Sequence, residues 1–364
     1  MLKIGIEKND KWLQICTIIS ALYGLLLVSS AVKSTESWSS IIVQAAAICI
    51  GMGAMFILSR IDYAYLTELN KVIMAGYIFL LILVLIIGIG KEDTGTTGWI
   101  SLGPVNIQPS EFAKLGYIIT FGTHLSSVQK KIHKFSTLIG LCIHAAVPLF
   151  LVLLQPDYGT AMVFIFITIF MMFFAGVRLR YFVMGFSAFV AAVPLLWYFV
   201  LDEFQKNRIY VFLDPQSSPM GAGYNVIQSK IAVGSGMVFG KGLFQGTQIQ
   251  LGYLPGKHTD FIFAVAGEEF GLIGCMLIIA LSAVIISRLF IGAERVKKDS
   301  GAFILIGIAA MFLFQNFENI GMCIGLMPVT GIPLPFFSYG GSSMITSFAS
   351  IGVAQSILKR KNYI

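Results

Sequence analysis

The chain has 364 residues, of which 57% are hydrophobic and 12% are charged, and its mean hydropathy is +0.84. A soluble domain carries roughly twice that charged fraction, so the composition excludes a soluble enzyme and favours a polytopic membrane protein. The net charge of +7 comes from basic residues in short loops, where it indicates membrane topology and not a nucleic-acid partner.

Runs of about 20 apolar residues recur along the chain, each long enough to cross a hydrocarbon core of ~30 Å. Backbone polar groups in lipid must be satisfied internally, and barrel-type alternation is absent, so only an all-α bundle fits. We predict one membrane domain over 1–364, with a large extracytoplasmic loop at about 201–260. The ten predicted transmembrane helices are 12–32, 39–58, 69–90, 110–128, 135–154, 157–176, 180–200, 261–287, 301–323 and 342–358.

The distribution of positive charge predicts which way the bundle faces. With the N-terminus inside, the inner segments hold 17 of the 25 Lys and Arg residues. Cytoplasmic loops carry an excess of these residues, so the bias places both termini in the cytoplasm. The five cysteines lie in apolar stretches without paired spacing, which favours small core residues over a disulfide framework or a metal site.

Three segments on the predicted outer side are unusual. The segment 91–109 contains "GTTGWISLGPVNIQP", and the loop 201–260 has the length typical of functional loops. Within that loop, the composition of 223–240 predicts a partly helical segment on the outer leaflet. The segment 324–341 is too rich in proline and glycine for a helix and too apolar for a solvated loop. We predict that it dips into the bundle, with Ser342 as the N-cap of the last helix.

Ionisable side chains at membrane depth are costly, so each is a candidate functional residue. These candidates are Glu111, Lys114, Asp157, Asp260, Glu268, Glu269 and Glu318. The first four lie at the starts of three helices that begin on the predicted outer side. Polar groups from these three helices are therefore expected to converge near the outer leaflet.

Each of these residues also has a structural interpretation. Glu111 and Lys114 are three residues apart on one helix and can form a structural ion pair, as readily as they can bind a substrate. Asp157 can be a helix cap, because a carboxylate at a helix N-terminus is favoured by the dipole. Trp99 can be an interfacial anchor. His258, a lone histidine near Asp260, is more often a plain loop residue than a catalyst.

Asp260 and Glu268 are not expected to form a catalytic pair. Along a helix they would lie ~12 Å apart and point about 80° apart. We expect Glu268 and Glu269 to contact buried polar groups of the ninth span. The candidates are Gln315, Asn316, Glu318 and Asn319.

Asp260 lies where the long loop re-enters the membrane. Partial desolvation at that boundary would raise the pKa of its carboxyl and suit it to general-base catalysis. Metalloprotease, Walker and dinucleotide-binding motifs are absent, and the sequence does not predict a metal cage built from protein alone.

Five motifs resemble the SEDS family, which includes RodA, FtsW and SpoVE, and within it RodA most. They are "GWISLGPVNIQPSEFAKL", "QPDYGTA", "GAGYNVIQSKIAVGSG", "LPGKHTDFIFAVAGEEFGLIG" and "PVTGIPLPFFSYGGSS", spread over about 100–352. The resemblance implies a peptidoglycan glycosyltransferase of the bacterial cytoplasmic membrane. Such a protein polymerises lipid II for cell-wall elongation and shape, releases undecaprenyl pyrophosphate, and works with a class B penicillin-binding protein that crosslinks the strands.

The same resemblance implies roles for individual residues. Asp260 matches the essential aspartate of the family and Trp99 its functional tryptophan. The polar residues matching those around the central cavity are Glu111, Lys114, Asp157 and Glu268. Two positions depart from the family pattern, because Thr96-Thr97-Gly98 precedes Trp99 where a basic residue is common, and Gly256 replaces a glutamate.

The implied reaction needs a base and positive charge for the leaving pyrophosphate. We assign the base to Asp260, and we expect His258, Lys257 and Lys230 beside the substrate. The candidate pyrophosphate-binding cations are Lys114, Lys230, Lys241, Lys257 and Arg208, and the alternative is a divalent ion, Mg²⁺ or Mn²⁺, bridging the phosphates. Three other functions stay open: a lipid II flippase, a scaffold for the crosslinking partner, and a division or sporulation paralogue.

Overall fold

The computed structural model describes residues 10–33, 38–90, 96–101, 103, 106–199, 203–217, 221, 223–296 and 300–360. Ten long helices in these ranges match the ten predicted spans, so the predicted helical membrane bundle is confirmed. Their bounds are α1 Lys11–Lys33, α2 Trp38–Arg60, α4 Asn70–Ile87, α6 Pro109–Val128, α7 Phe135–Leu153, α8 Tyr158–Phe174, α9 Leu179–Phe199, α13 Ile262–Arg295, α14 Ser300–Ile324 and α15 Gly341–Arg360.

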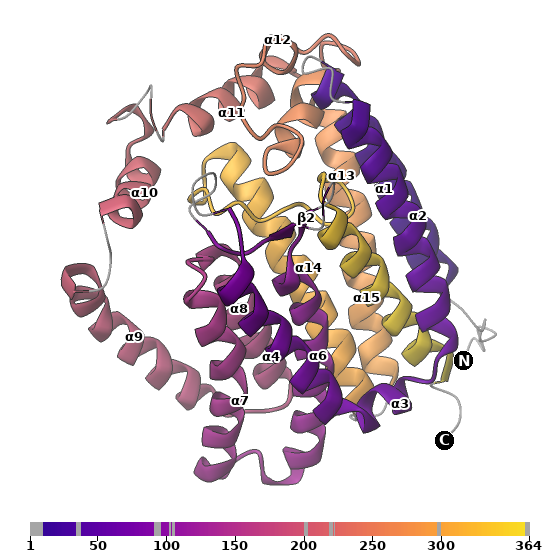
Figure 1. Ribbon diagram of the computed structural model, residues 1–364, viewed down its shortest axis with the longest axis vertical. Coiled ribbons are helices and arrows are strands. Elements are labelled where there is room, and N and C mark those ends of the chain that lie inside the picture. The colour runs from indigo at the N-terminus through magenta and orange to yellow at the C-terminus, as the bar shows by residue number, and fades with distance from the viewer. Residues whose placement is uncertain are drawn as a thin grey trace.

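Shorter elements lie between the spans. They are the helices α3 Tyr63–Glu68, α10 Glu203–Leu213, α11 Tyr224–Ser235 and α12 Thr247–Gln250, two 3-10 turns at Gln129–Lys131 and Pro215–Ser217, and the strands β1 Ile100–Ser101 and β2 Asn106–Ile107. The strands pair antiparallel, with Ile100 opposite Ile107, and were not predicted. The helices α11 and α12 lie at the end of the bundle opposite the chain ends (Figure 1), and we name this the loop end.

Seven of the described helices are long and apolar enough to cross a membrane by length and composition alone: α1, α2, α4, α7, α9, α13 and α14. The helix α8 is a shorter apolar helix, whereas α6 and α15 bury many polar and small residues between other helices. For example, a Cβ at Gly352 of α15 would lie 2.8 Å from the Met55 Cα of α2. Small residues of this kind let helices approach closely in membranes.

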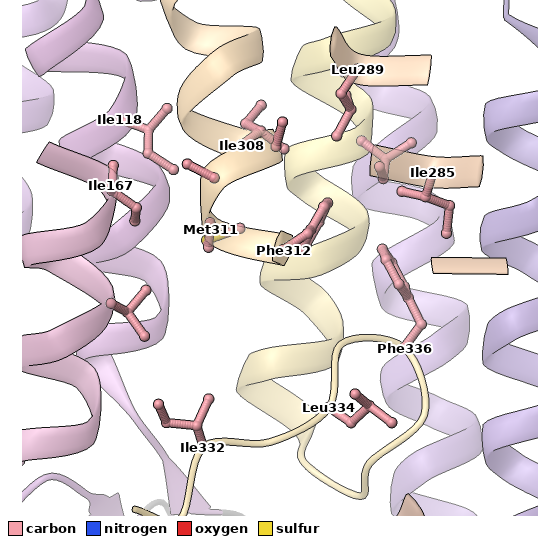
Figure 2. Close-up of a cluster of buried hydrophobic side chains, with 14 of the residues drawn as sticks. Ile118, Ile167, Ile285, Leu289, Ile308, Met311, Phe312, Ile332, Leu334 and Phe336 are labelled. Atoms are coloured by element: carbon pink, nitrogen blue, oxygen red, sulfur yellow. The ribbon is translucent and has the colours of Figure 1, made fainter. Parts of the chain in front are cut away.

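The helix α14 lies at the centre of the bundle and packs against α6, α8 and α13. Its buried side chains Ile308, Met311 and Phe312 form one hydrophobic cluster with Ile118 of α6 and Ile167 of α8 (Figure 2). In contrast, α9 lies apart from the rest of the bundle (Figure 1), and its apolar side chains are largely exposed. Lipid is the natural cover for such a helix.

The helix α13 contains a break that was not predicted. Gly271 has φ 63° and ψ −154°, a left-handed conformation that favours glycine. The break frees backbone groups of α13, and the loop after α11 pairs with them. The amide of Lys241 donates to the carbonyl of Glu268 (2.9 Å), and the amide of Leu272 donates to the carbonyl of Met237 (2.9 Å). The loop is therefore joined to α13 by backbone hydrogen bonds.

Residues 325–340, which we name the proline–glycine segment, contain no helix and enter the bundle, as predicted. Leu334 and Phe336 are buried among the core side chains (Figure 2). Gln44 of α2 fixes the end of the segment, because it donates to the carbonyl of Ser338 (3.0 Å) and accepts from the amide of Gly340 (3.2 Å). The predicted N-cap is wrong: α15 begins at Gly341, so Ser342 lies inside its first turn.

Candidate active site

Asp260 is the last polar residue before α13, and a tight turn determines where it lies. The amides of Thr259 and Asp260 donate to the carbonyl of Gly256, at 3.1 Å each. Gly256 has φ +67°, so this turn favours the glycine that stands where the resemblance implies a glutamate. Asp260 is partly exposed, whereas the next residue, Phe261, is buried. The carboxylate therefore lies where the loop enters the bundle.

The proline–glycine segment holds the backbone on either side of Asp260. The hydroxyl of Ser338 donates to the carbonyl of Thr259 (2.6 Å), and the amide of Tyr339 donates to the carbonyl of His258 (2.8 Å). From α14, the Nδ2 of Asn319 donates to the carbonyl of Asp260 (2.8 Å). Three consecutive carbonyl groups are thus bound, which fixes the backbone around Asp260.

The predicted histidine lies beside this turn. The ring of His258 packs against the ring of Tyr339, with centroids 5.4 Å apart. Burial, followed by the positive charge of Lys257, lowers the pKa of the His258 imidazole. Its binding role stays a prediction.

Asp157 and the segment around Trp99 form a second polar group at the loop end. The Oδ1 of Asp157 accepts from the amide of Thr160 (3.0 Å), so the cap interpretation is confirmed. The Oδ2 accepts from the Nε2 of Gln108 (3.2 Å). A Cβ at Gly98, next to Trp99, would lie 3.8 Å from that same Oδ2. The Trp99 segment therefore lies over the start of α8.

Glu111 and Lys114 form a buried ion pair on α6. The Lys114 Nζ lies 2.7 Å from the Glu111 Oε1, and the two side chains are 1% and 4% exposed. The structural interpretation of the pair is confirmed, and its role in binding stays a prediction. Because each charge is neutralised by the other, breaking the pair would leave a single buried charge.

Glu268 corrects one prediction, because its partners come from the loop and not from the ninth span. Its carboxylate accepts from the Lys241 Nζ (2.7 Å), the Thr247 hydroxyl (3.1 Å) and the amides of Gln248 (2.9 Å) and Ile249 (3.0 Å). This fully buried carboxylate holds the start of α12 against α13.

Glu269 also contacts groups outside the ninth span. It accepts from the hydroxyl of Ser30 on α1 (2.5 Å) and from the Nε2 of Gln250 (3.3 Å). Sequence reasoning selected the right kind of partner, a buried polar group, on the wrong element.

The candidate pyrophosphate-binding cations lie in different environments. Lys257 is buried and donates to the carbonyl of Ile249 (2.5 Å), and burial lowers the pKa of its ammonium, although Glu269 acts in the opposite direction. Lys230 of α11 is exposed, and its side chain lies over Gly325, where a Cβ would meet it. The side chain of Arg208 lies outside the described residues.

Comparisons with known proteins decide the family. The family profile described as "Cell cycle protein", which represents FtsW, RodA and SpoVE, matches residues 11–363. The chain belongs to this family.

Relatives within the FtsW/RodA/SpoVE family cover most of the chain. Stage V sporulation protein E of Bacillus subtilis is 38% identical over 365 residues, covering 97% of this chain and 98% of that protein. The peptidoglycan glycosyltransferase MrdB of Escherichia coli K12 is 38% identical over 286 residues, covering 78% and 77%.

Solved structures of relatives have the same fold. A chain from a peptidoglycan synthase complex that coordinates polymerization and crosslinking has a TM-score of 0.83 at 30% identity, covering 98% of this chain and 99% of that one. RodA of Thermus thermophilus has a TM-score of 0.73 at 27% identity, covering 98% of both chains.

The structure of this FtsW/RodA/SpoVE chain also shows residues that sequence reasoning missed. Gln108 links the Trp99 segment, Asp157 and α15. Its backbone amide donates to the hydroxyl of Ser342 (3.0 Å), and its side-chain Nε2 donates to Asp157. Ser338 fixes the Asp260 turn. Both residues lie inside the motifs that carry the resemblance, but an uncharged side chain within a motif does not reveal which backbone group it binds.

Proposed function

We propose that the chain is a peptidoglycan glycosyltransferase. It polymerises lipid II into glycan strands at the outer face of the bacterial cytoplasmic membrane, for cell-wall elongation and shape. The placement of Asp260 carries the proposal. This carboxylate is partly exposed, its backbone is fixed by the proline–glycine segment and Asn319, and it lies at one end of a membrane bundle. The loop end then faces outward, and both termini lie in the cytoplasm.

The reaction requires one base. The 4-hydroxyl of the acceptor sugar attacks the anomeric carbon of the donor, and the bond from that carbon to the pyrophosphate oxygen breaks. Undecaprenyl pyrophosphate leaves with the electron pair, and the Asp260 carboxylate accepts the hydroxyl proton. Pyrophosphate is a good leaving group and needs no general acid, so the pair of carboxyl groups found in glycoside hydrolases is not required.

Lys230 is the best placed of the candidate cations to meet the pyrophosphate. Among the four candidates whose side chains the structure describes, its side chain is the exposed one. Lys114 and Lys241 are engaged with carboxylates, and Lys257 with a backbone carbonyl. An exposed ammonium on α11 can bind an anionic head group without first breaking an internal contact.

A divalent cation is a second way to neutralise the leaving group. Within the described ranges, no group of three or more His, Cys, Asp or Glu side chains could hold a metal ion. Mg²⁺ or Mn²⁺ would therefore arrive bound mainly by the phosphates. Chelation followed by re-addition of each metal tests this part of the proposal.

The proposed partner is a class B penicillin-binding protein, which would crosslink the strands. The structural likeness to a chain of a peptidoglycan synthase complex supports this. Lipid II and the surrounding membrane lipids complete the set of proposed ligands.

Purified protein in detergent, given labelled lipid II with and without the partner, tests the function. We expect the wild type to make long glycan, and D260N to make none while it still inserts and binds the partner. Transfer of lipid II between vesicle leaflets without glycan would establish a flippase instead. Normal cell growth supported by D260N would establish a scaffold.

A further inference from the structure

Glu318 on α14 is a buried carboxyl group for which the reaction above has no role. It is fully buried, and neither carboxyl oxygen has a hydrogen-bond partner in the parts of the chain that the structure describes. An ionised carboxylate without a partner is very costly inside a membrane protein. The position therefore favours the form of the carboxyl group that carries a proton.

The carboxyl group of Asp260, the proposed base, lies near the carboxyl group of Glu318. The carboxyl groups of Glu318 and Asp260 are close enough to interact electrostatically. The residue after Glu318, Asn319, donates from one amide group to the carbonyls of Asp260 and Ile332, at 2.8 Å each. One turn of α14 thus holds the backbone of the proposed base and places a second carboxyl group beside it.

The proline–glycine segment runs past both carboxyl groups. A Cβ at Gly331 would lie 3.6 Å from the Asp260 Oδ2. The hydroxyl of Thr330 lies beside the Glu318 carboxyl group, although it completes no hydrogen bond of ordinary geometry. Consecutive residues of this segment, Thr330 and Gly331, therefore lie beside Glu318 and Asp260 respectively.

Deeper in the bundle, the next turn of α14 carries the buried amides of Gln315 and Asn316. Beyond them, toward the end of the bundle opposite the loop end, α14 presents Ile308, Met311 and Phe312 to the hydrophobic cluster (Figure 2). This apolar cluster separates Glu318 from the opposite end of the bundle, whereas Asp260 lies on the loop-end side.

Other titratable and charged groups on the elements around this pair are engaged elsewhere or lie at the surface. They are Glu111 and Lys114 on α6, Asp157 on α8, Lys230 on α11, Glu268 and Glu269 on α13, Lys257 and His258 in the loop, and Cys323 on α14. The thiol of Cys323 is close to both carboxyl groups, but it donates weakly to the Asp260 carbonyl (3.7 Å). None of these is a cation bound to Glu318.

We propose that Glu318 is a positioning residue that keeps the single proton of the Asp260–Glu318 pair, so that the negative charge rests on Asp260. This rests on the proposed function, in which ionised Asp260 takes the proton of the acceptor hydroxyl. Two neighbouring carboxyl groups titrate as a pair, and the better solvated one ionises first. Asp260 is partly exposed, whereas Glu318 is fully buried.

Infrared difference spectroscopy across a pH titration tests the pairing without any substrate. We expect a protonated-carboxyl band at neutral pH in the wild type, and its loss in E318Q. In D260N the band should titrate at a lower pH than in the wild type, because a neighbouring negative charge has been removed. The control is N316L, which removes the buried amide of Asn316 on the same helix. It should leave the band unchanged.

The pH profile of polymerisation tests the effect on the base. E318Q is permanently neutral, so we expect it to keep at least half of the wild-type kcat/KM at neutral pH. Its pH profile should differ from that of the wild type only at and above the pH at which the wild-type infrared band is lost, because Glu318 ionises there. An equal loss of activity at every pH would mean a structural role and overturn the proposal, as would a profile identical to that of the wild type.

The proposed function and the proposed role of Glu318 can be refuted independently of each other. A wild type that makes no glycan would remove the proposed function, yet the infrared titration would still decide whether the carboxyl groups share a proton. If E318Q does not fold, the D260N spectrum decides, and a band that titrates as in the wild type overturns the pairing.

Discussion

Replacing Glu268 with alanine tests whether this residue supports the loop or acts on a substrate. Its carboxylate is 0% exposed and accepts from Lys241, Thr247 and the amides of Gln248 and Ile249. E268A removes all four hydrogen bonds at once. No part of the Glu268 side chain faces solvent, so water cannot take its place beside the Ile249 amide without opening the loop, although Lys241 and Thr247 themselves reach solvent.

The expected cost follows from those contacts. A buried amide left without its acceptor costs about 1–3 kcal/mol, and the amides of Gln248 and Ile249 both lose theirs. The side chain of Lys241 is 28% exposed, so its ammonium can rehydrate, and the loss of this ion pair destabilises the fold less than the loss of a fully buried pair would. We expect E268A to destabilise the fold by roughly 3–5 kcal/mol, in the range measured when one partner of a buried pair is removed.

Thermal unfolding in detergent and amide hydrogen exchange measure the effect. Tm should fall by several degrees, and exchange should accelerate at Gln248 and Ile249 and at Lys241, whose amide is bonded to the α13 break. The control is E294A, which removes an exposed carboxylate from the far end of the same helix. If E268A melts with the wild type and keeps its amides protected while polymerisation is lost, Glu268 acts on substrate and the structural reasoning is refuted.

Three further predictions concern other parts of the site. K114M should lower the free energy of unfolding by about 3–5 kcal/mol, because Glu111 is left as an unpaired buried charge. The double variant K114M/E111L should recover most of the lost Tm, and equal Tm values for the two variants would contradict this. G271A should lower Tm because a Cβ would lie 2.5 Å from the Gly240 amide at a positive φ, whereas G76A on α4, where a Cβ meets nothing within 4 Å, should not. The lowered pKa of His258 means that the unfolded chain binds a proton that the folded chain does not, so Tm should fall as pH drops below about 6.5, and H258N should flatten that decline.

The spans could be predicted from sequence because lipid imposes a length and a composition on every helix. The predicted span 39–58 corresponds to α2, and 301–323 to α14, each within two residues. The position of the proline–glycine segment inside the bundle could also be predicted, because its prolines and glycines exclude a helix while its hydropathy favours burial. In both cases the signal is summed over many residues, so no single contact has to be known.

The details of the site depend on single contacts, and there prediction failed. Gly267, Gly271 and Gly274 surround Glu268 in the sequence, and nothing in it distinguishes a glycine that allows close packing from Gly271, which breaks the helix at a positive φ. The prediction that Glu268 contacts the ninth span assumed that buried polar side chains bind one another. Its carboxylate instead accepts hydrogen bonds from two backbone amides. The pattern of residue types does not show which backbone groups a side chain will bind. The Gln108 contacts were missed for the same reason.

The break at Gly271 also explains how a loop can position the proposed base, Asp260. Loops are usually the most mobile parts of a protein, whereas a general base must be held in place for efficient proton transfer. Here the loop after α11 takes up the backbone groups freed at the break, and Glu268 binds the start of α12. On its other side the Asp260 turn is held by Ser338 and Asn319. The proposed base therefore belongs to a unit of α13, α14 and the proline–glycine segment that is held together by these hydrogen bonds.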